Sequence, residues 1–71
     1  MPDPRQVLEA LSDGGRPTSE LVSALDCSFE EVEARIGLMK DEGLVDRLHG
    51  TMPSGWTLTR QGEVELSRQR G

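Results

Sequence analysis

The sequence contains few of the residues that form disulfides, metal sites and large aromatic surfaces. Its 71 residues include one cysteine, Cys27, one histidine, His49, and two aromatic residues, Phe29 and Trp56. A single cysteine excludes an internal disulfide, and one Cys with one His falls short of the about four ligands of a structural zinc ion. We therefore expect the chain to bind no metal and no cofactor.

Long apolar runs are missing as well. No apolar stretch approaches the roughly 18 residues that cross a membrane. The first residues, MPDPRQVLEALSDGG, carry acids and prolines where a signal peptide has a basic start followed by an apolar segment. These absences predict a cytoplasmic protein with no membrane partner.

The residues needed for catalysis are equally sparse. Cys27 and His49 fall in separate predicted elements, so they do not suggest a nucleophile with its base. The pair Gly14-Gly15 stops a helix and lacks the spacing of a phosphate-binding loop. The chain is therefore not expected to be an enzyme.

Positive charge is in short supply, and lysine especially so. Thirteen Asp and Glu residues stand against eight Lys and Arg residues, which gives a net charge of −5. This balance argues against a simple electrostatic grip on nucleic-acid phosphates, which uses Lys and Arg. An acid-rich, lysine-poor surface suits molar salt, where the Debye length is about 3 Å and like charges barely repel. We therefore hypothesise that the protein comes from an extreme halophile.

Apolar periodicity predicts two helices in the first part of the chain. Residues 1–4 are expected to form a disordered lead, and residues 5–12 a first helix that Gly14 and Gly15 stop. A second helix of about two turns follows, with Thr18 or Ser19 as its N-cap.

A third helix is predicted for residues 29–42. Ser28 and Glu31 match the capping box, in which each side chain binds the other residue's backbone N–H. Gly43 is placed as the C-terminal cap. An inward stripe has the spacing i, i+4, i+7 and consists of Val32, Ile36 and Met39.

The apolar period then changes to that of strands. Residues 44–49 and 56–59 read as two strands joined by the loop GTMPSG. A last helix follows, capped by Thr59 and weakened by Gly62. The predicted core comprises Val7, Leu8, Leu11, Leu21, Leu25, Val32, Ile36, Met39, Leu44, Leu48, Trp56, Leu58 and Leu66.

This order of elements predicts an α+β domain over residues 5–69. Two short helices joined by a three-residue turn and followed by a hairpin are typical of a winged helix-turn-helix. We expect a three-helix core, a two-stranded β wing and a short C-terminal helix.

Two segments carry a resemblance to known regulators. PTSELVSALDCSFEEVEARIGLMKDEGLV resembles the helix-turn-helix of MarR-like and ArsR-like winged-helix proteins, and WTLTRQG resembles the segment that ends the wing in MarR-like and phage-repressor-like proteins. The resemblance covers about residues 5–68. It implies that the recognition helix is 29–42, that the wing is 48–56, and that the chain is a small DNA-binding transcriptional regulator whose partner is double-stranded DNA.

The resemblance also implies a set of contact residues. On the recognition helix they are Ser28, Phe29, Glu30, Glu33, Ala34, Arg35, Gly37 and Lys40. On and beside the wing they are Arg47, His49, Thr51, Ser54 and Arg60. Arg35, Arg47 and Arg60 would contact phosphates.

The charge of the recognition helix leaves a second hypothesis open. Residues 28–43 carry two basic and five acidic residues, whereas the related regulators usually place Arg, Ser, Thr, Asn or Gln there. The domain could instead be a protein–protein interaction module that turns Phe29, Leu38 and the acidic helix toward a basic partner. Phe29 could equally pack on Leu25 or Leu44. Because no long extra helix is present to build a MarR-like dimer interface, we expect a monomer or a weak homodimer.

Overall fold

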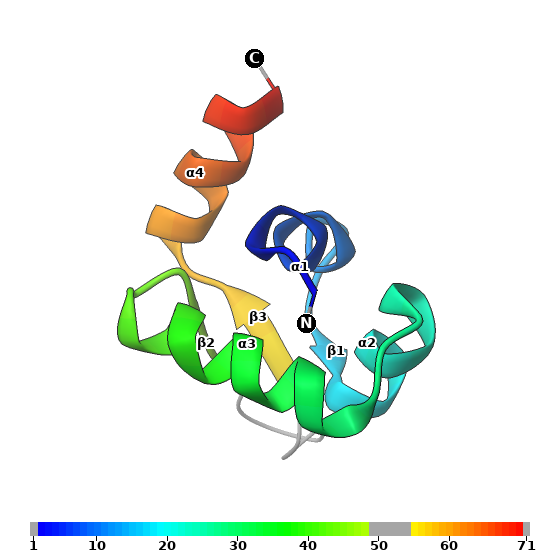
Figure 1. Ribbon diagram of the computed structural model, residues 1–71. Coiled ribbons are helices and arrows are strands. Elements are labelled where there is room, and N and C mark those ends of the chain that lie inside the picture. Colours follow the sequence, from blue (N-terminus) through cyan, green and yellow to red (C-terminus); the bar gives the residue numbers. More distant parts are fainter. Residues whose placement is uncertain (1, 49–54, 71) are drawn as a thin grey trace.

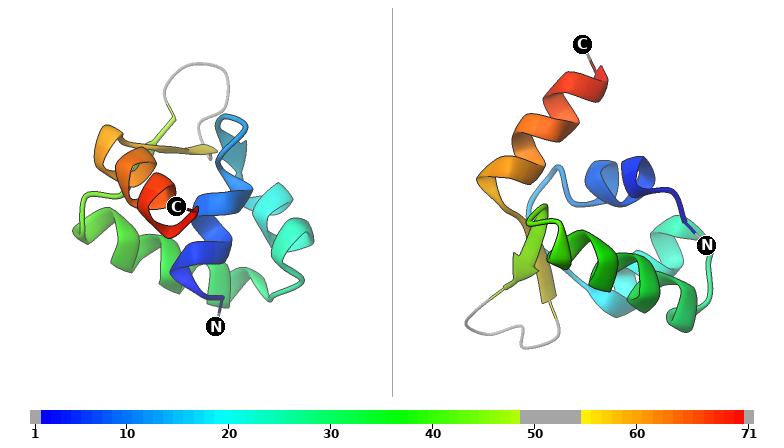
Figure 2. Two further views of the ribbon diagram at one scale, coloured as in Figure 1. Left: turned by 90° about the horizontal axis from the view of Figure 1, so that it is seen from above. Right: turned by 60° about the vertical axis from the view of Figure 1, so that its left-hand side comes forward.

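The computed structural model describes residues 2–48 and 55–70, and in these ranges it contains four helices and three strands (Figure 1). In chain order the elements are α1 (Pro4–Ala10), β1 (Arg16–Pro17), α2 (Thr18–Leu25), α3 (Phe29–Asp41), β2 (Val45–Arg47), β3 (Gly55–Leu58) and α4 (Arg60–Arg70). The α+β class predicted from the sequence is confirmed. Helix α1 packs against the other three helices, with α2 on one side and α4 on the other (Figure 2).

The strands form one antiparallel sheet in the order β1-β3-β2. Arg16 pairs with Trp56 across β1 and β3, and Val45 pairs with Leu58 across β2 and β3. The prediction of a two-stranded sheet was wrong, because β1 adds a third strand. A segment of two residues shows no periodicity from which a strand could be predicted, and proline is depleted in strands. Proline is nevertheless tolerated in an edge strand, and β1 is such a strand.

Capping side chains explain where α1 and α3 begin. The backbone N–H of Arg5 donates to Asp3 Oδ1 at 3.1 Å, and that of Asp3 donates to Gln6 Oε1 at 2.9 Å. Helix α1 therefore begins at Pro4, one residue before the predicted start. At α3 the N–H of Glu31 donates to Ser28 Oγ, and the N–H of Ser28 to Glu31 Oε1, both at 3.2 Å. The predicted capping box is confirmed.

The predicted start of α2 needs correction. Neither Thr18 nor Ser19 caps this helix: Pro17 occupies the N-cap position and no side-chain cap is made. Thr18 is instead the first helical residue, and it is buried with 4% of its surface exposed. Its Oγ1 accepts a hydrogen bond from Trp56 Nε1 at 3.1 Å. Thr18 therefore connects α2 to the sheet through this hydrogen bond. Its position at the start of a helix had suggested a capping role instead.

Removal of the Thr18 hydroxyl should test this contact. Thr18→Val keeps the shape of the side chain but leaves the buried Trp56 N–H without that acceptor. We expect a loss of about 1–3 kcal/mol in the free energy of unfolding, measured by urea denaturation. Thr57→Val on β3 is the control, with an expected change within about 0.5 kcal/mol. Equal effects of the two substitutions would show that the Trp56 bond contributes nothing.

The core largely follows the sequence prediction. The buried apolar residues are Val7, Leu8, Leu11, Leu21, Val32, Ile36, Met39, Val45, Trp56 and Leu66. Four residues predicted for the core, namely Leu25, Leu44, Leu48 and Leu58, are only half-buried. Val45 was missed because the alternation from 44 to 49 was read with Leu44 and Leu48 inward. Adjacent residues of a strand point to opposite faces, and it is Val45, the first residue of β2, that points into the core.

Two hydrogen bonds from Thr59 attach the start of α4 to the connection between α3 and β2. Thr59 Oγ1 donates to the carbonyl of Gly43 at 2.6 Å, and the Thr59 N–H donates to the carbonyl of Leu44 at 3.1 Å. Thr59 Oγ1 also accepts from the Gly62 N–H at 3.0 Å, so its predicted capping role is confirmed. Gly62 is buried, and a Cβ at this position would overlap the carbonyl oxygen of Leu44. Gly62 was predicted to weaken the last helix, but its missing side chain is what lets α4 approach the backbone of Leu44.

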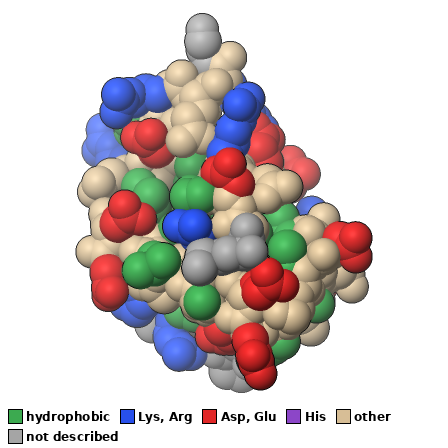
Figure 3. Space-filling model, in the orientation of Figure 1, with side chains coloured by type: hydrophobic (Ala, Val, Ile, Leu, Met, Phe, Trp, Pro, Cys, Tyr) green, Lys and Arg blue, Asp and Glu red, His purple; other side chains and the backbone are tan. Residues whose placement is uncertain are grey.

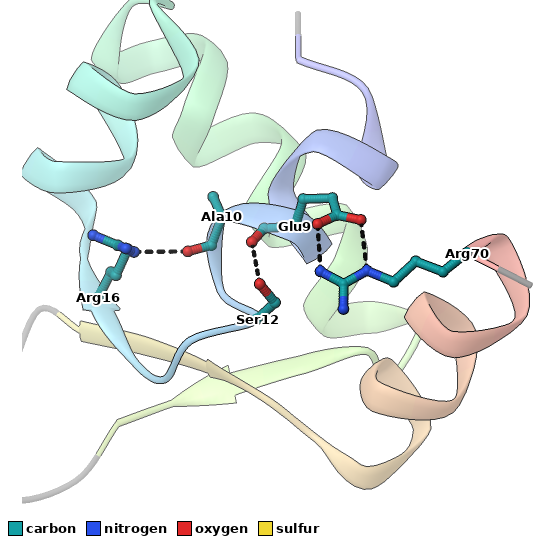
Figure 4. A network of polar contacts seen from close by, with 5 residues as sticks. All are labelled: Glu9, Ala10, Ser12, Arg16 and Arg70. Atoms are coloured by element: carbon teal, nitrogen blue, oxygen red, sulfur yellow. Dashed lines mark hydrogen bonds and ion pairs between the residues drawn. The ribbon is translucent and has the colours of Figure 1, made fainter.

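Side chains hold α4 and β1 against α1 (Figure 4). Arg70 Nε and Nη2 donate to the two carboxylate oxygens of Glu9 at 2.9 and 2.6 Å, and Arg16 Nε donates to the carbonyl of Ala10 at 2.7 Å. The hydrogen bonds from Arg70 lower the pKa of Glu9; the charges of Arg70 and Arg5 add to this against an opposing desolvation. The same hydrogen bonds raise the pKa of Arg70. Glu9 is therefore expected to stay ionised in moderately acidic solution.

The pH dependence of this pair follows from the direction of the Glu9 shift. Any stabilisation by the pair is present above the ordinary pKa of 4.5 and is lost as the pH falls through the lower pKa of the folded state. We expect the Glu9 pKa, followed by NMR titration, to rise toward its ordinary value in Arg70→Gln. Arg68→Gln, two residues away on α4, should leave it unchanged. An identical Glu9 pKa in wild type and Arg70→Gln would contradict the bidentate pair.

Candidate interaction surface on α3 and the hairpin

A three-residue turn sets the position of α3 relative to α2. Helix α2 ends at Leu25, and the C-cap residue Asp26 has a φ of 53°, in the left-handed region that Asp tolerates better than most residues. Cys27 is half-buried and its Sγ donates to the carbonyl of Leu25 at 3.2 Å. Ser28 then caps α3. The cysteine lies inside the turn and packs against the core. Asp26, Cys27 and Ser28 together therefore account for the geometry of the turn between α2 and α3.

Helix α3 buries one face and leaves the opposite face open. The inward stripe of Val32, Ile36 and Met39 is confirmed, since all three are 0% exposed. We define the α3 face as the exposed residues on the opposite side: Glu30, Glu33, Ala34, Gly37, Leu38 and Asp41. Gly37 has no heavy atom within 4 Å of the place a Cβ would take. Four of the predicted contact residues, Glu30, Glu33, Ala34 and Gly37, lie together on this face.

The two basic residues of α3 are not part of the α3 face. Arg35 is half-buried, and its Nε donates to the backbone carbonyl of Pro2 at 2.9 Å. Lys40 lies 3.7 Å from Asp46 Oδ1 in an exposed ion pair. The prediction that Arg35 points outward from α3 therefore needs correction, because it turns toward the segment before α1. The open face of α3 carries carboxylates and no cation.

Two large apolar side chains on α3 are exposed. Phe29 is 57% exposed and Leu38 is 48% exposed, so Phe29 does not pack inward on Leu25 or Leu44. Nine residues of helix at about 100° each separate the two by half a turn. They therefore lie along opposite edges of the α3 face. Ser28, also a predicted contact, is exposed but its hydroxyl is engaged in the cap.

The sheet and the start of α4 provide two exposed arginines. Arg47 on β2 is exposed, and its guanidinium lies 5.1 Å from the centroid of the Trp56 ring. This cation–π contact holds the arginine against Trp56, on the face of the sheet that also carries the buried Val45. Arg60 is exposed at the first position of α4. The other predicted hairpin contacts, His49, Thr51 and Ser54, lie outside the described residues.

Figure 3 shows how charge is distributed over the side of the molecule that carries α3. Acidic side chains are spread over this side, and basic side chains form separate groups toward α4 at the top, near the centre and at the lower left (Figure 3). The three arginines predicted to bind phosphates, Arg35, Arg47 and Arg60, come from three different elements. No continuous basic strip crosses the part of this side that is described. The described part of this side therefore lacks the continuous basic surface that binding phosphates by charge alone would require.

The hollows of the surface do not coincide with the α3 face. An open groove of about 440 Å³ lies between α1 and α2, and its lining is Arg5, Gln6, Glu9, Ala10, Ala24 and Leu25. Among residues 2–48 and 55–70, no three His, Cys, Asp or Glu side chains are placed to share a metal ion. In the same ranges no helix is long and apolar enough to cross a bilayer. The candidate interaction surface therefore consists of the α3 face together with the exposed Arg47 and Arg60.

Comparisons of the chain with protein-family models, with curated proteins and with solved structures found no match. The functional proposal consequently rests on the arrangement of the chain's own residues. Leu38 had been named from the sequence as a contact of the protein-interaction module, whereas Asp41 had not been named among the contact residues. The signal for Asp41 was available, because a helical projection centred on Val32, Ile36 and Met39 places it on the outer side.

Proposed function

We propose that the chain is a small winged-helix regulator that binds double-stranded DNA through α3 and the β2–β3 hairpin. The observation that carries this proposal is the order and exposure of the elements. An antiparallel hairpin directly follows helix α2, a three-residue turn and α3. The inward side of α3 is buried in the core, and its outward side is exposed. Proteins that read the major groove with a helix need such an uncovered helix face supported by a rigid core.

The chemistry of the α3 face supports a particular kind of contact. Ala34 and Gly37 are small, so the backbone of α3 could come close to base edges. Glu30 and Glu33 offer acceptors only, and a carboxylate accepts a hydrogen bond from the N4 amino group of cytosine. Phosphate contacts would come from Arg47 on β2 and Arg60 at the start of α4, which are both exposed.

The experiment is a binding screen of randomised duplexes against the full chain in low and molar KCl. The Debye length falls from about 10 Å at 0.1 M to about 3 Å at 1 M, so the screen covers both electrostatic regimes. Ala34→Glu, which is exposed and should fold, is expected to abolish binding to any selected duplex. Arg47→Gln should weaken binding to all duplexes alike and lower the salt slope by about one. Arg5→Gln on α1 is the control.

The DNA-binding proposal is overturned if a chain shown to be folded by circular dichroism retains no duplex in either salt regime. Binding that survives Ala34→Glu would move the DNA contact away from the α3 face.

One observation favours a second candidate function, a protein–protein interaction module. Arg35 is turned away, Lys40 stands beside Asp46, and the α3 face has three carboxylates with the exposed Leu38 at its edge. A basic, partly apolar protein surface would complement it better than phosphates do. Chemical-shift mapping separates the candidates: shifts on α3 with a basic amphipathic peptide and none with duplex DNA would select the second.

The composition supports the further proposal of a halophilic origin. Thirteen acids against eight bases leave a net charge of −5. Like-charge repulsion between exposed carboxylates is screened once the Debye length shrinks to about 3 Å near 1 M salt. We expect the melting temperature to rise steadily as KCl is increased from dilute to molar concentration. Equal stability in dilute buffer and in molar KCl would contradict this origin.

A further inference from the structure

The outer surface of α4 is an unpartnered strip that combines one apolar residue with two cations. Gly62 and Leu66 are buried on the inner side of the helix. On the outer side Arg60, Val64 and Arg68 follow at i, i+4 and i+8, and Val64 is 53% exposed. We call these three residues the α4 strip. Arg68 lies 3.3 Å from Glu65, but the Arg68 side chain is 74% exposed, so this surface pair contributes little.

A patch of opposite charge lies on α3. Leu38 is 48% exposed, and the exposed carboxylates of Asp41 and Glu42 follow it by three and four residues. Residues at these spacings are neighbours on a helix surface. Ala34, one turn before Leu38, is small and leaves room beside it. We call these four residues the Leu38 patch. Like the α4 strip, it has one exposed apolar side chain at its centre, but its charges are negative.

We propose that the α4 strip of one copy of this chain docks on the Leu38 patch of a second copy. Val64 would contact Leu38, while Arg60 and Arg68 would lie against the carboxylates of Asp41 and Glu42. Pairing of two α4 helices about Val64 is disfavoured, because an antiparallel arrangement would bring Arg60 of one copy to Arg68 of the other. The charges therefore select α3 of the second copy as the occupant.

The arrangement of the two helices determines the form of the assembly. Helix α4 rises from the end of β3 away from α3, so its outer side and the α3 face belong to different sides of the molecule (Figures 1 and 2). Each copy can therefore offer its strip to one neighbour and its patch to another. Such a heterologous contact is not closed by a two-fold axis and produces rings of three or more copies or open chains. Because the Leu38 patch shares Ala34, Leu38 and Asp41 with the α3 face, docking there would exclude any other ligand of that face.

The test is sedimentation velocity of the full chain at increasing protein concentration. Near 0.01 M salt, where the Debye length is about 30 Å, the average sedimentation coefficient should rise without a plateau at the dimer. In molar salt it should return to the monomer value. A chain that is monomeric at every salt concentration at which it is folded, including one that folds only in molar salt, overturns the proposal.

Two variants distinguish this contact from other forms of association. Val64→Glu and Leu38→Glu each reverse the complementarity at one surface, and both positions are exposed, so folding should be retained. Each variant alone is expected to be monomeric. An equal mixture should give a dimer and nothing larger, because the first variant keeps its patch and the second keeps its strip. Ala24→Glu on α2 is the control and should assemble like the wild type.

Two outcomes of the variant experiment would overturn the proposal. One is assembly of Val64→Glu alone to the wild-type extent. The other is the absence of any complex in the mixture under conditions in which the wild type assembles. Circular dichroism of each variant at the same salt concentration confirms that a loss of assembly is not a loss of fold.

Discussion

Gly62→Ala is expected to lower the free energy of unfolding by roughly 2 kcal/mol, although alanine is the better helix former by about 1 kcal/mol. A Cβ on residue 62 would overlap the carbonyl oxygen of Leu44, which is a backbone atom and cannot rotate away. Helix α4 would have to move outward to relieve the overlap. That movement would stretch the hydrogen bonds from Thr59 to Gly43 and Leu44.

Gly37→Ala provides a control with the same chemistry and the opposite expected sign. Gly37 also lies in a helix, but nothing occupies the space around its missing Cβ. Only the helix propensity changes there, so we expect a gain of about 0.5–1 kcal/mol. In a domain of this size 1 kcal/mol moves the melting temperature by about 4–8 °C. A stabilising Gly62→Ala would show that α4 is not seated against Leu44 as described.

Ile36→Asp is expected to leave the chain unfolded. The Ile36 side chain is 0% exposed at the centre of the inward stripe of α3. A carboxylate at that position would lose its hydration without gaining a partner, a change that costs at least about 4 kcal/mol. A chain of 71 residues has a total stability of about 4–10 kcal/mol. The substitution therefore removes most or all of the available stability.

Leu38→Asp separates this effect from a general intolerance of acids on α3. It places the same side chain two residues further along the same helix, at a position that is 48% exposed. We expect its far-ultraviolet circular dichroism and melting profile to stay close to those of the wild type. A wild-type melting profile for Ile36→Asp would mean that the inward face of α3 has been assigned wrongly.

Local signals were sufficient to predict α3 and most of the core. Ser28 and Glu31 cap each other within a single turn, and the spacing of Val32, Ile36 and Met39 defines the inward face without reference to the rest of the chain. Once that face is known, the exposure of Glu30, Glu33, Ala34 and Gly37 follows from helical geometry. For this reason, the part of the candidate surface on α3 was largely predictable, whereas the orientation of Arg35 toward Pro2 was not.

Local patterns and composition were enough to predict the α+β class, the four helices, the capping of α3 and the acidity of its outer face. Each of these depends on residues within a few positions of one another or on composition. Four features follow from tertiary packing instead: Arg16 and Pro17 form a strand, Val45 faces inward, Thr18 accepts from Trp56, and Gly62 allows the approach of α4. Three of them depend on partners 18 or more residues away, and Val45 faces inward where it pairs with Leu58, 13 residues away. No local pattern records such a partner.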